Sequence, residues 1–138
     1  MTVVVDAALV VAALLDGGSD GEWSRDVLVS GPLAAPHLMP VEVANILRRA
    51  TARGDVSTDS ASIAHADLMS LPVELFPYAG TADRIWELRH NLTCYDAWYV
   101  ALAEELDVAL ATLDDKLAAA PGVRCAFLTL GAWSVPTS

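Results

Sequence analysis

Four acidic residues lie in otherwise apolar surroundings, at places where the elements of a fold would begin or end: Asp6, Glu42, Asp96 and Asp114. Taken singly, each has an ordinary explanation as a helix cap, a loop residue or an acid near a helix N-terminus. Taken together, they come from four separate segments that one topology could bring to one place. Two carboxylates about 5 Å apart repel each other by roughly 3 kcal/mol at an effective dielectric of 20. A fold that gathers four of them therefore requires a bound cation or protonated acids.

The kind of cation follows from the kind of ligand. Oxygen ligands alone favour a hard divalent ion such as Mg²⁺ or Mn²⁺. The three histidines have no ligand spacing with each other or with the two cysteines, Cys94 and Cys125, so we do not expect zinc. The sequence also lacks a Ser–His–Asp or Cys–His arrangement and a GxxxxGK phosphate-binding loop. The candidate chemistry is therefore metal-assisted hydrolysis.

Short apolar strands alternating with helices must position these acids. The pattern predicts strands at Thr2–Val5, Leu33–Ala35, Val73–Phe76, Val108–Ala111 and Arg124–Leu128. It predicts helices at Ala7–Leu15, Met39–Arg53, residues 58–70, Thr81–His90, Tyr95–Leu106 and Asp115–Ala119, with a glycine-rich loop at Asp16–Glu22. Such an order predicts an α/β sandwich around a mostly parallel central sheet. The carboxyl ends of parallel strands share one edge, where ligands bind, and Asp6 and Asp114 each follow a strand.

Length and charge narrow the class of protein. The chain has 138 residues, 54% hydrophobic and 19% charged, which excludes intrinsic disorder and predicts one compact domain over residues 1–138. The longest apolar stretch, Val3–Leu15, contains Asp6 and is too short to cross a bilayer, so we expect a cytoplasmic protein. The net charge of −10 argues against a protein that coats nucleic acid. Most of the acids are expected simply to keep the domain soluble.

A few basic and polar residues are candidates for contacting an anionic substrate. At about 100° per residue, Asn45 and Arg49 share the helix face of Glu42, and Lys116 follows Asp115. Arg48 and Arg53 on the same helix, with Arg84 and Arg89 ahead of Asp96, complete the set. Arg49 is the best phosphate contact among them.

The order and spacing of these pieces resemble the VapC-type ribonuclease toxins of the PIN-domain family, over essentially the whole chain. The resemblance rests on an apolar strand ending in Asp (Val3–Asp6), on E-x-A-N-x-L (Glu42–Leu47), on Y-D-A followed by A-L-A-x-E-L (Tyr95–Leu106), and on T-x-D (Thr112–Asp114). It implies a PIN-like three-layer α/β/α fold and a Mg²⁺- or Mn²⁺-dependent endoribonuclease acting on structured RNA such as tRNA or rRNA. It also implies a VapB-type antitoxin as inhibitor and a homodimer.

By the same resemblance, Asp6, Glu42, Asp96 and Asp114 are the metal-site residues, Asp115 is a candidate further ligand, and Thr112 is a supporting hydroxyl beside them. Two departures stand out. Many members carry Ser or Thr two residues after the first Asp, where this chain has Ala8, and Lys116 takes a place where an acid is sometimes found. The first departure concerns metal affinity rather than the identity of the site.

Two alternatives from other classes stay open at this stage. In the first, Ala8 weakens or inactivates the metal site of a PIN fold, and the protein acts only by binding a partner. A phospho-accepting receiver domain is also an acidic α/β sandwich of this length, but it requires an acidic pair near the first strand, where this chain has Asp6 alone.

Overall fold

A computed structural model describes residues 1–134, with the backbone alone described over residues 132–134. Its centre is a six-stranded sheet in the order β3-β2-β1-β4-β5-β6. The first five strands of the chain pair in parallel, and β6 runs antiparallel to β5. The strands are β1 (Val3–Val5), β2 (Leu33–Pro36), β3 (Val73–Phe76), β4 (Ala109–Ala111), β5 (Phe127–Thr129) and β6 (Ala132–Ser134). The predicted α/β class with a mostly parallel sheet is confirmed.

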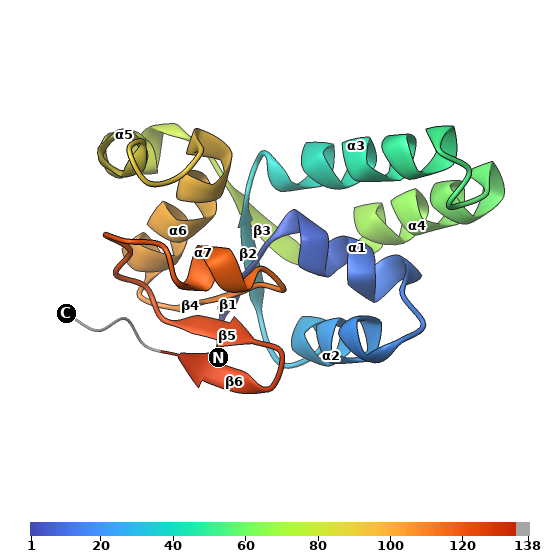
Figure 1. Cartoon of the computed structure of the whole chain (residues 1–138), viewed down its shortest axis with the longest axis horizontal. Coiled ribbons are helices and arrows are strands. Elements are labelled where there is room, and N and C mark those ends of the chain that lie inside the picture. Colours follow the sequence, from blue (N-terminus) through green and yellow to red (C-terminus); the bar gives the residue numbers. More distant parts are fainter. Residues whose placement is uncertain (135–138) are drawn as a thin grey trace.

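Helices cover the sheet on both sides. The helices are α1 (Ala7–Leu15), α2 (Ser19–Leu28), α3 (Met39–Ala52), α4 (Thr58–Ser70), α5 (Ala82–Leu88), α6 (Cys94–Leu106) and α7 (Asp115–Ala118), with a 3₁₀ turn η1 (Ala79–Thr81) before α5. Figure 1 shows α5 and α6 on one side of the sheet and α1 to α4 on the other. No helix among residues 1–134 is long and apolar enough to cross a membrane.

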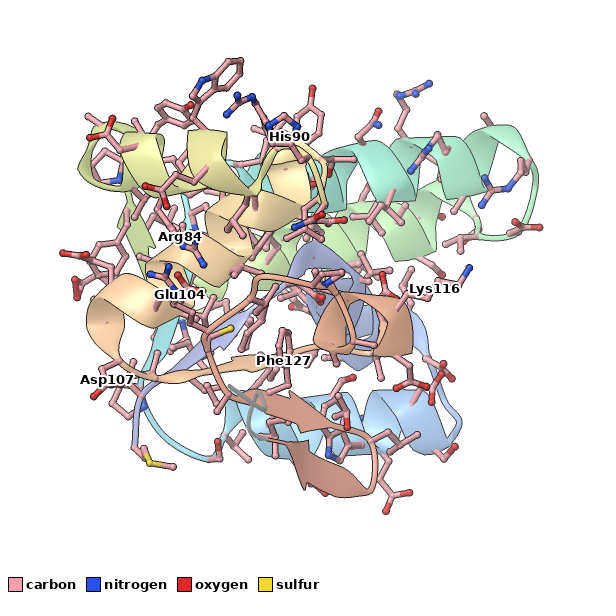
Figure 2. All side chains as sticks on the ribbon, turned by 60° about the vertical axis from the view of Figure 1, so that its left-hand side comes forward. Arg84, His90, Glu104, Asp107, Lys116 and Phe127 are labelled. Carbon is pink, nitrogen blue, oxygen red and sulfur yellow. The ribbon has the colours of Figure 1, made fainter. Side chains whose placement is uncertain are left out.

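The core is built from the apolar runs that predicted the strands. Every residue of β1 and β4 is buried, since both strands lie in the interior of the sheet and are covered on both faces. Their register pairs Val3 with Ala109 and Val5 with Ala111. Phe127 on the neighbouring β5 is 1% exposed and extends this core (Figure 2). The two strands therefore end side by side.

Two elements differ from the sequence-based prediction. The stretch Asp16–Glu22 is not a loop throughout, because α2 begins at Ser19. Gly21 is required inside that helix: a Cβ there would lie 1.8 Å from the carbonyl oxygen of Asp16, at the end of α1. The glycine reflects the close approach of the two helices rather than a turn.

The second difference lies at the C-terminal end of the sheet. The predicted final strand Arg124–Leu128 starts three residues later, as Phe127–Thr129, and is followed by β6. Leu130 and Gly131 form the two-residue connection, with Gly131 at φ 81°, and Thr129 pairs with Ala132. This hairpin adds an antiparallel edge strand that the sequence-based prediction missed.

Candidate active site

Asp6 and Asp114 lie where the strand order of the sheet reverses. From β1, the chain passes outward on one side to β2 and β3 and later returns to β4 on the other side. Such a switch point leaves a crevice at the carboxyl ends of the strands, where open α/β sheets bind their ligands. Asp6 immediately follows β1, and Asp114 follows β4 after two residues. The predicted meeting of these two chain segments is confirmed.

Asp6 is a buried carboxylate held by two donors. Its side chain is the N-cap of α1 and accepts a hydrogen bond from the Leu9 amide at 2.9 Å. The Thr112 hydroxyl donates to its other oxygen. Burial is the main cause that raises the pKa of Asp6 from 3.8 to about 6, and the charges of Asp96 and Asp114 add to the rise, while the two hydrogen bonds oppose it.

Asp114 is also a helix cap and is connected to Asp6 through Thr112. Its Oδ1 accepts hydrogen bonds from the amides of Lys116 at 2.9 Å and Leu117 at 3.3 Å, at the start of α7. Its own amide donates to the Thr112 hydroxyl oxygen at 3.0 Å. Thr112, fully buried, therefore accepts from one acidic residue and donates to the other. Thr112 therefore lies beside the carboxylates, where the resemblance implied a supporting hydroxyl.

Glu42 and Asp96 approach from α3 and α6. Glu42 lies in the first turn of α3 and is half-buried, and its Oε1 accepts a hydrogen bond from the Tyr99 hydroxyl at 2.6 Å. Asp96 lies in the first turn of α6, and its amide donates to the N-cap Thr93. Burial raises the pKa of both acids. The charge of Asp96 raises that of Glu42 further, and the charge of Asp114 raises that of Asp96.

The carboxylates thus share one electrostatic environment. The charges of Asp96 and Asp114 raise the pKa of Asp6. The charge of Asp114 also raises the pKa of Asp96, and the charge of Asp96 raises that of Glu42. The hydroxyl of Tyr99 lies among them too: its pKa is raised by burial, by the hydrogen bond to Glu42, and by the charges of Glu42, Asp6 and Asp96. Asp96 and Asp114 thus disfavour the ionisation of neighbouring acids, which is the condition that a bound cation relieves.

The donor set fits a hard divalent cation by its chemistry, since it consists of carboxylates from four segments with no nitrogen or sulfur donor. Among the described residues, no three His, Cys, Asp or Glu side chains are gathered tightly enough to hold one ion directly. We therefore expect a hydrated ion that some of these acids hold directly and the others hold through its water molecules, as the retained water shell of Mg²⁺ allows.

The remaining predicted residues are exposed on α3, the helix that carries Glu42, and on α7, the helix that Asp114 precedes. Asp115 and Lys116 are exposed on α7, and the Lys116 side chain points outward in Figure 2. Asn45 and Arg49 are exposed on α3, and Asn45 accepts a hydrogen bond from the Arg48 guanidinium at 2.9 Å. Their roles toward RNA stay predictions.

Other cations have partners elsewhere. Arg53 pairs with Asp55 at 3.0 Å, and the Arg89 guanidinium lies 4.3 Å from the ring centre of Trp86. Arg84 faces Glu104 (Figure 2), with 2.7 Å between Nε and Oε1. These interactions within the protein therefore do not support a role in substrate binding for Arg53, Arg84 and Arg89.

Two residues near the site differ from the sequence-based expectations. A cysteine with no metal or base partner in the sequence is expected to pack in the core, but Cys94 is exposed at the first position of α6. An aromatic residue at helical spacing is expected to serve only the core. Tyr99 is indeed 2% exposed, but its hydroxyl also donates a hydrogen bond to Glu42. Its position three residues after Asp96 is the signal that could have found it, because residues three apart on a helix are neighbours.

Comparisons with known proteins agree with this geometry. The PIN domain family model matches residues 3–123. Ribonuclease VapC1 of Mycobacterium tuberculosis is 45% identical over 123 residues, covering 88% of this chain and 92% of the relative. Ribonuclease VapC9 of the same organism is 39% identical, covering 89% and 94% of the two chains.

Solved structures with low identity share the fold. Mycobacterium tuberculosis VapC20, a sarcin–ricin loop cleaving toxin, superimposes with a TM-score of 0.66 at 19% identity, covering 88% of this chain and 95% of that chain. VapBC2 from Rickettsia felis, bound to a DNA fragment from its promoter, gives a TM-score of 0.66 at 13% identity over 97% of this chain and 100% of that one.

Proposed function

Since the chain belongs to the PIN-domain family and is a VapC-type ribonuclease of a toxin–antitoxin pair, we propose that it hydrolyses RNA with Mg²⁺ or Mn²⁺ bound by Asp6, Glu42, Asp96 and Asp114. The observation that carries the proposal is that Asp6 and Asp114 follow the neighbouring strands β1 and β4 and are joined through Thr112, at the switch point of the sheet. Asp96 lies close enough to raise the pKa of both Asp6 and Glu42. Asp115 is the candidate for a further ligand on the same edge.

The chain's own residues set the geometry of the reaction. A divalent ion at these carboxylates supplies positive charge for the phosphate and lowers the pKa of a bound water molecule. Asp6 is the most rigid ligand, because Leu9 and Thr112 hold its two oxygens. Asp114 uses Oδ1 for capping α7, so Oδ2 would be the oxygen able to hold the ion. Water would attack phosphorus in line, forming a new P–O bond while the opposite P–O bond to the RNA breaks, and the proton that the water loses would end on the departing RNA oxygen.

RNA binding requires positive charge, because an acidic site alone repels the phosphate backbone. Arg49 and Lys116, both exposed, are the proposed phosphate contacts on α3 and α7, with Asn45 as a further polar contact. The substrate class is structured RNA such as tRNA or rRNA, which places the activity in the cytoplasm. The sarcin–ricin loop specificity of VapC20 supports rRNA as one of these two classes.

The partner that inhibits the enzyme is a VapB-type antitoxin. Structural neighbours with this fold include VapBC and FitAB complexes, some bound to DNA. An antitoxin arginine that enters the carboxylate site supplies the positive charge that the acids lack, and it excludes the metal and the RNA at once. We further propose that the toxin acts as a homodimer.

The test is a pair of asparagine variants. Asp6→Asn removes a buried carboxylate of the site, and Asp67→Asn removes an exposed one on α4. We expect Asp6→Asn to lose cleavage of an RNA substrate and calorimetric binding of Mn²⁺, and Asp67→Asn to keep both. Wild-type protein that binds no Mn²⁺ and cuts no RNA would instead indicate a partner-binding scaffold.

A further inference from the structure

Glu42 is the longest of the four acidic side chains and reaches the site from a different helix than the other acids do. A glutamate carboxylate has three rotatable bonds behind it, and ordering such a chain has an entropic cost. Glu42 is half-buried, so water alone does not fix its position. Something in the protein has to orient it toward the other acids.

Tyr99 provides that contact. Tyr99 lies in α6, three residues after Asp96, and is 2% exposed. Its hydroxyl donates to Glu42 Oε1 at 2.6 Å, across 57 positions in the sequence. Among the described residues, Tyr99 is the one side chain that hydrogen-bonds Glu42. The bond engages one carboxylate oxygen and leaves Oε2 free.

The same arrangement recurs at the other acids. Thr112 holds Asp6 Oδ2, and the α7 amides hold Asp114 Oδ1. A hydrogen-bond donor behind a metal ligand orients that ligand. Removing such a donor lowers metal affinity or activity by about 10- to 100-fold. Tyr99 therefore occupies, for Glu42, the position that Thr112 occupies for Asp6.

We infer that Tyr99 is a positioning residue that aims the Glu42 carboxylate at the divalent ion, so that α6 supplies both Asp96 and the orientation of the acid on α3. The inference rests on the proposed function, since it presumes that Glu42 meets the metal. It assigns Tyr99 no contact with RNA.

The experiment uses Tyr99→Phe, which removes the hydroxyl and keeps the buried ring. The matched control is Tyr95→Phe, the same chemical change one helical turn earlier at a side chain 62% exposed. We expect Tyr99→Phe to weaken Mn²⁺ binding to the RNA-free protein, measured calorimetrically, by about tenfold, and to lower kcat by about 10- to 100-fold with KM for RNA changed less than about twofold. Tyr95→Phe keeps wild-type values.

A double variant separates positioning from other roles. Glu42→Gln keeps an acceptor for Tyr99 but removes the charge that binds the ion. If Tyr99 acts through Glu42, adding Tyr99→Phe to Glu42→Gln changes kcat little beyond the loss in Glu42→Gln alone. Circular dichroism and thermal melting confirm that each variant is folded.

The contrary outcomes differ for the two claims. Wild-type Mn²⁺ affinity and kcat in folded Tyr99→Phe overturn the positioning role, and so does a raised KM with unchanged kcat, which would indicate a contact with RNA. If Glu42→Gln itself keeps full activity, the metal site as proposed is wrong and the role of Tyr99 fails with it. If Glu42→Gln is inactive while Tyr99→Phe is fully active, only this inference fails.

Discussion

Thr112 donates its hydroxyl hydrogen to the buried carboxylate of Asp6 at 2.5 Å, joining the end of β4 to the end of β1 across 106 positions of sequence. The same hydroxyl oxygen accepts the amide of Asp114. Because β1 and β4 are neighbours in the sheet, this one buried side chain sets the spacing of two acids. This part of the site is thus fixed at the edge of the sheet by a buried side chain.

Replacing Thr112 by valine tests this connection. Valine keeps the shape of the side chain but offers Asp6 no donor and Asp114 no acceptor. We expect a loss of about 1.5–3 kcal/mol in the free energy of unfolding, since hydrogen bonds to charged groups fall in that range. RNA cleavage should fall by about 10- to 100-fold. Chemical unfolding and cleavage kinetics measure the two effects.

Thr81→Val is the control for that change, because Thr81 is also buried and its hydroxyl bonds the Tyr78 carbonyl away from the site. It should leave kcat at the wild-type value. A Thr112→Val protein with unchanged kcat would show that the position of Asp6 does not depend on this hydroxyl.

The pKa of Asp6 predicts how stability depends on pH. Between its ordinary value of 3.8 and about 6, the folded protein binds more protons at Asp6 than the unfolded chain does, so the free energy of unfolding falls as the pH rises through this interval. The fall totals about 3 kcal/mol and is complete above pH 6. Glu42 and Asp96 act in the same direction, since their pKa values are raised as well.

Urea unfolding of metal-free wild type and Asp6→Asn between pH 4 and pH 7 measures this contribution. The stability of Asp6→Asn relative to wild type should increase with pH up to about 6 and then level off, because asparagine carries no charge to bury. A difference that stays constant over this range would mean that Asp6 has an ordinary pKa.

Some of this site could be predicted from the sequence because its signals are local. An apolar β-branched run that ends in Asp6 marks a buried strand end, and Val43, Leu47 and Ala50 at helical spacing mark the inward face of the helix that carries Glu42. Other features depend on tertiary contacts. Gly17 and Gly18 suggested a loop, whereas Gly21 inside α2 is present because Asp16 lies against it. Helical spacing indicated that Tyr99 is buried, but not that its hydroxyl meets a residue on α3.

The ion pair of Arg84 and Glu104 should matter for stability and not for catalysis. The two side chains are 20% and 13% exposed, and Glu104 Oε2 also accepts the Arg124 amide at 2.7 Å. Arg84→Met leaves the partly buried Glu104 without its counter-ion, which should cost about 2 kcal/mol, between the values for exposed and fully buried pairs. Thermal melting should show a clear loss of stability, and kcat below the transition should equal that of the wild type.

Arg53→Met provides the comparison at an exposed pair. Arg53 and Asp55 are both more than 60% exposed, so the same substitution there should change the free energy of unfolding by less than about 1 kcal/mol. Equal effects of the two substitutions would show that the lower exposure of the Arg84–Glu104 pair adds nothing to its contribution to stability.

Arg49 is the last residue whose role can be decided by measurement. It is exposed on α3, the helix that carries Glu42, and binding of RNA to a protein of net charge −10 has to rely on few cations. If Arg49 contacts a phosphate, Arg49→Gln weakens RNA binding about equally for different sequences and lowers the slope of log K against log salt by about one. Fluorescence anisotropy with an inactive Asp6→Asn background measures this without cleavage. Arg53→Gln in the same background, where Asp55 already neutralises the arginine, should leave the slope unchanged. If the slope is also unchanged in Arg49→Gln, Arg49 makes no contact with a phosphate and is simply solvated. Lys116 is then the next candidate for the phosphate contact.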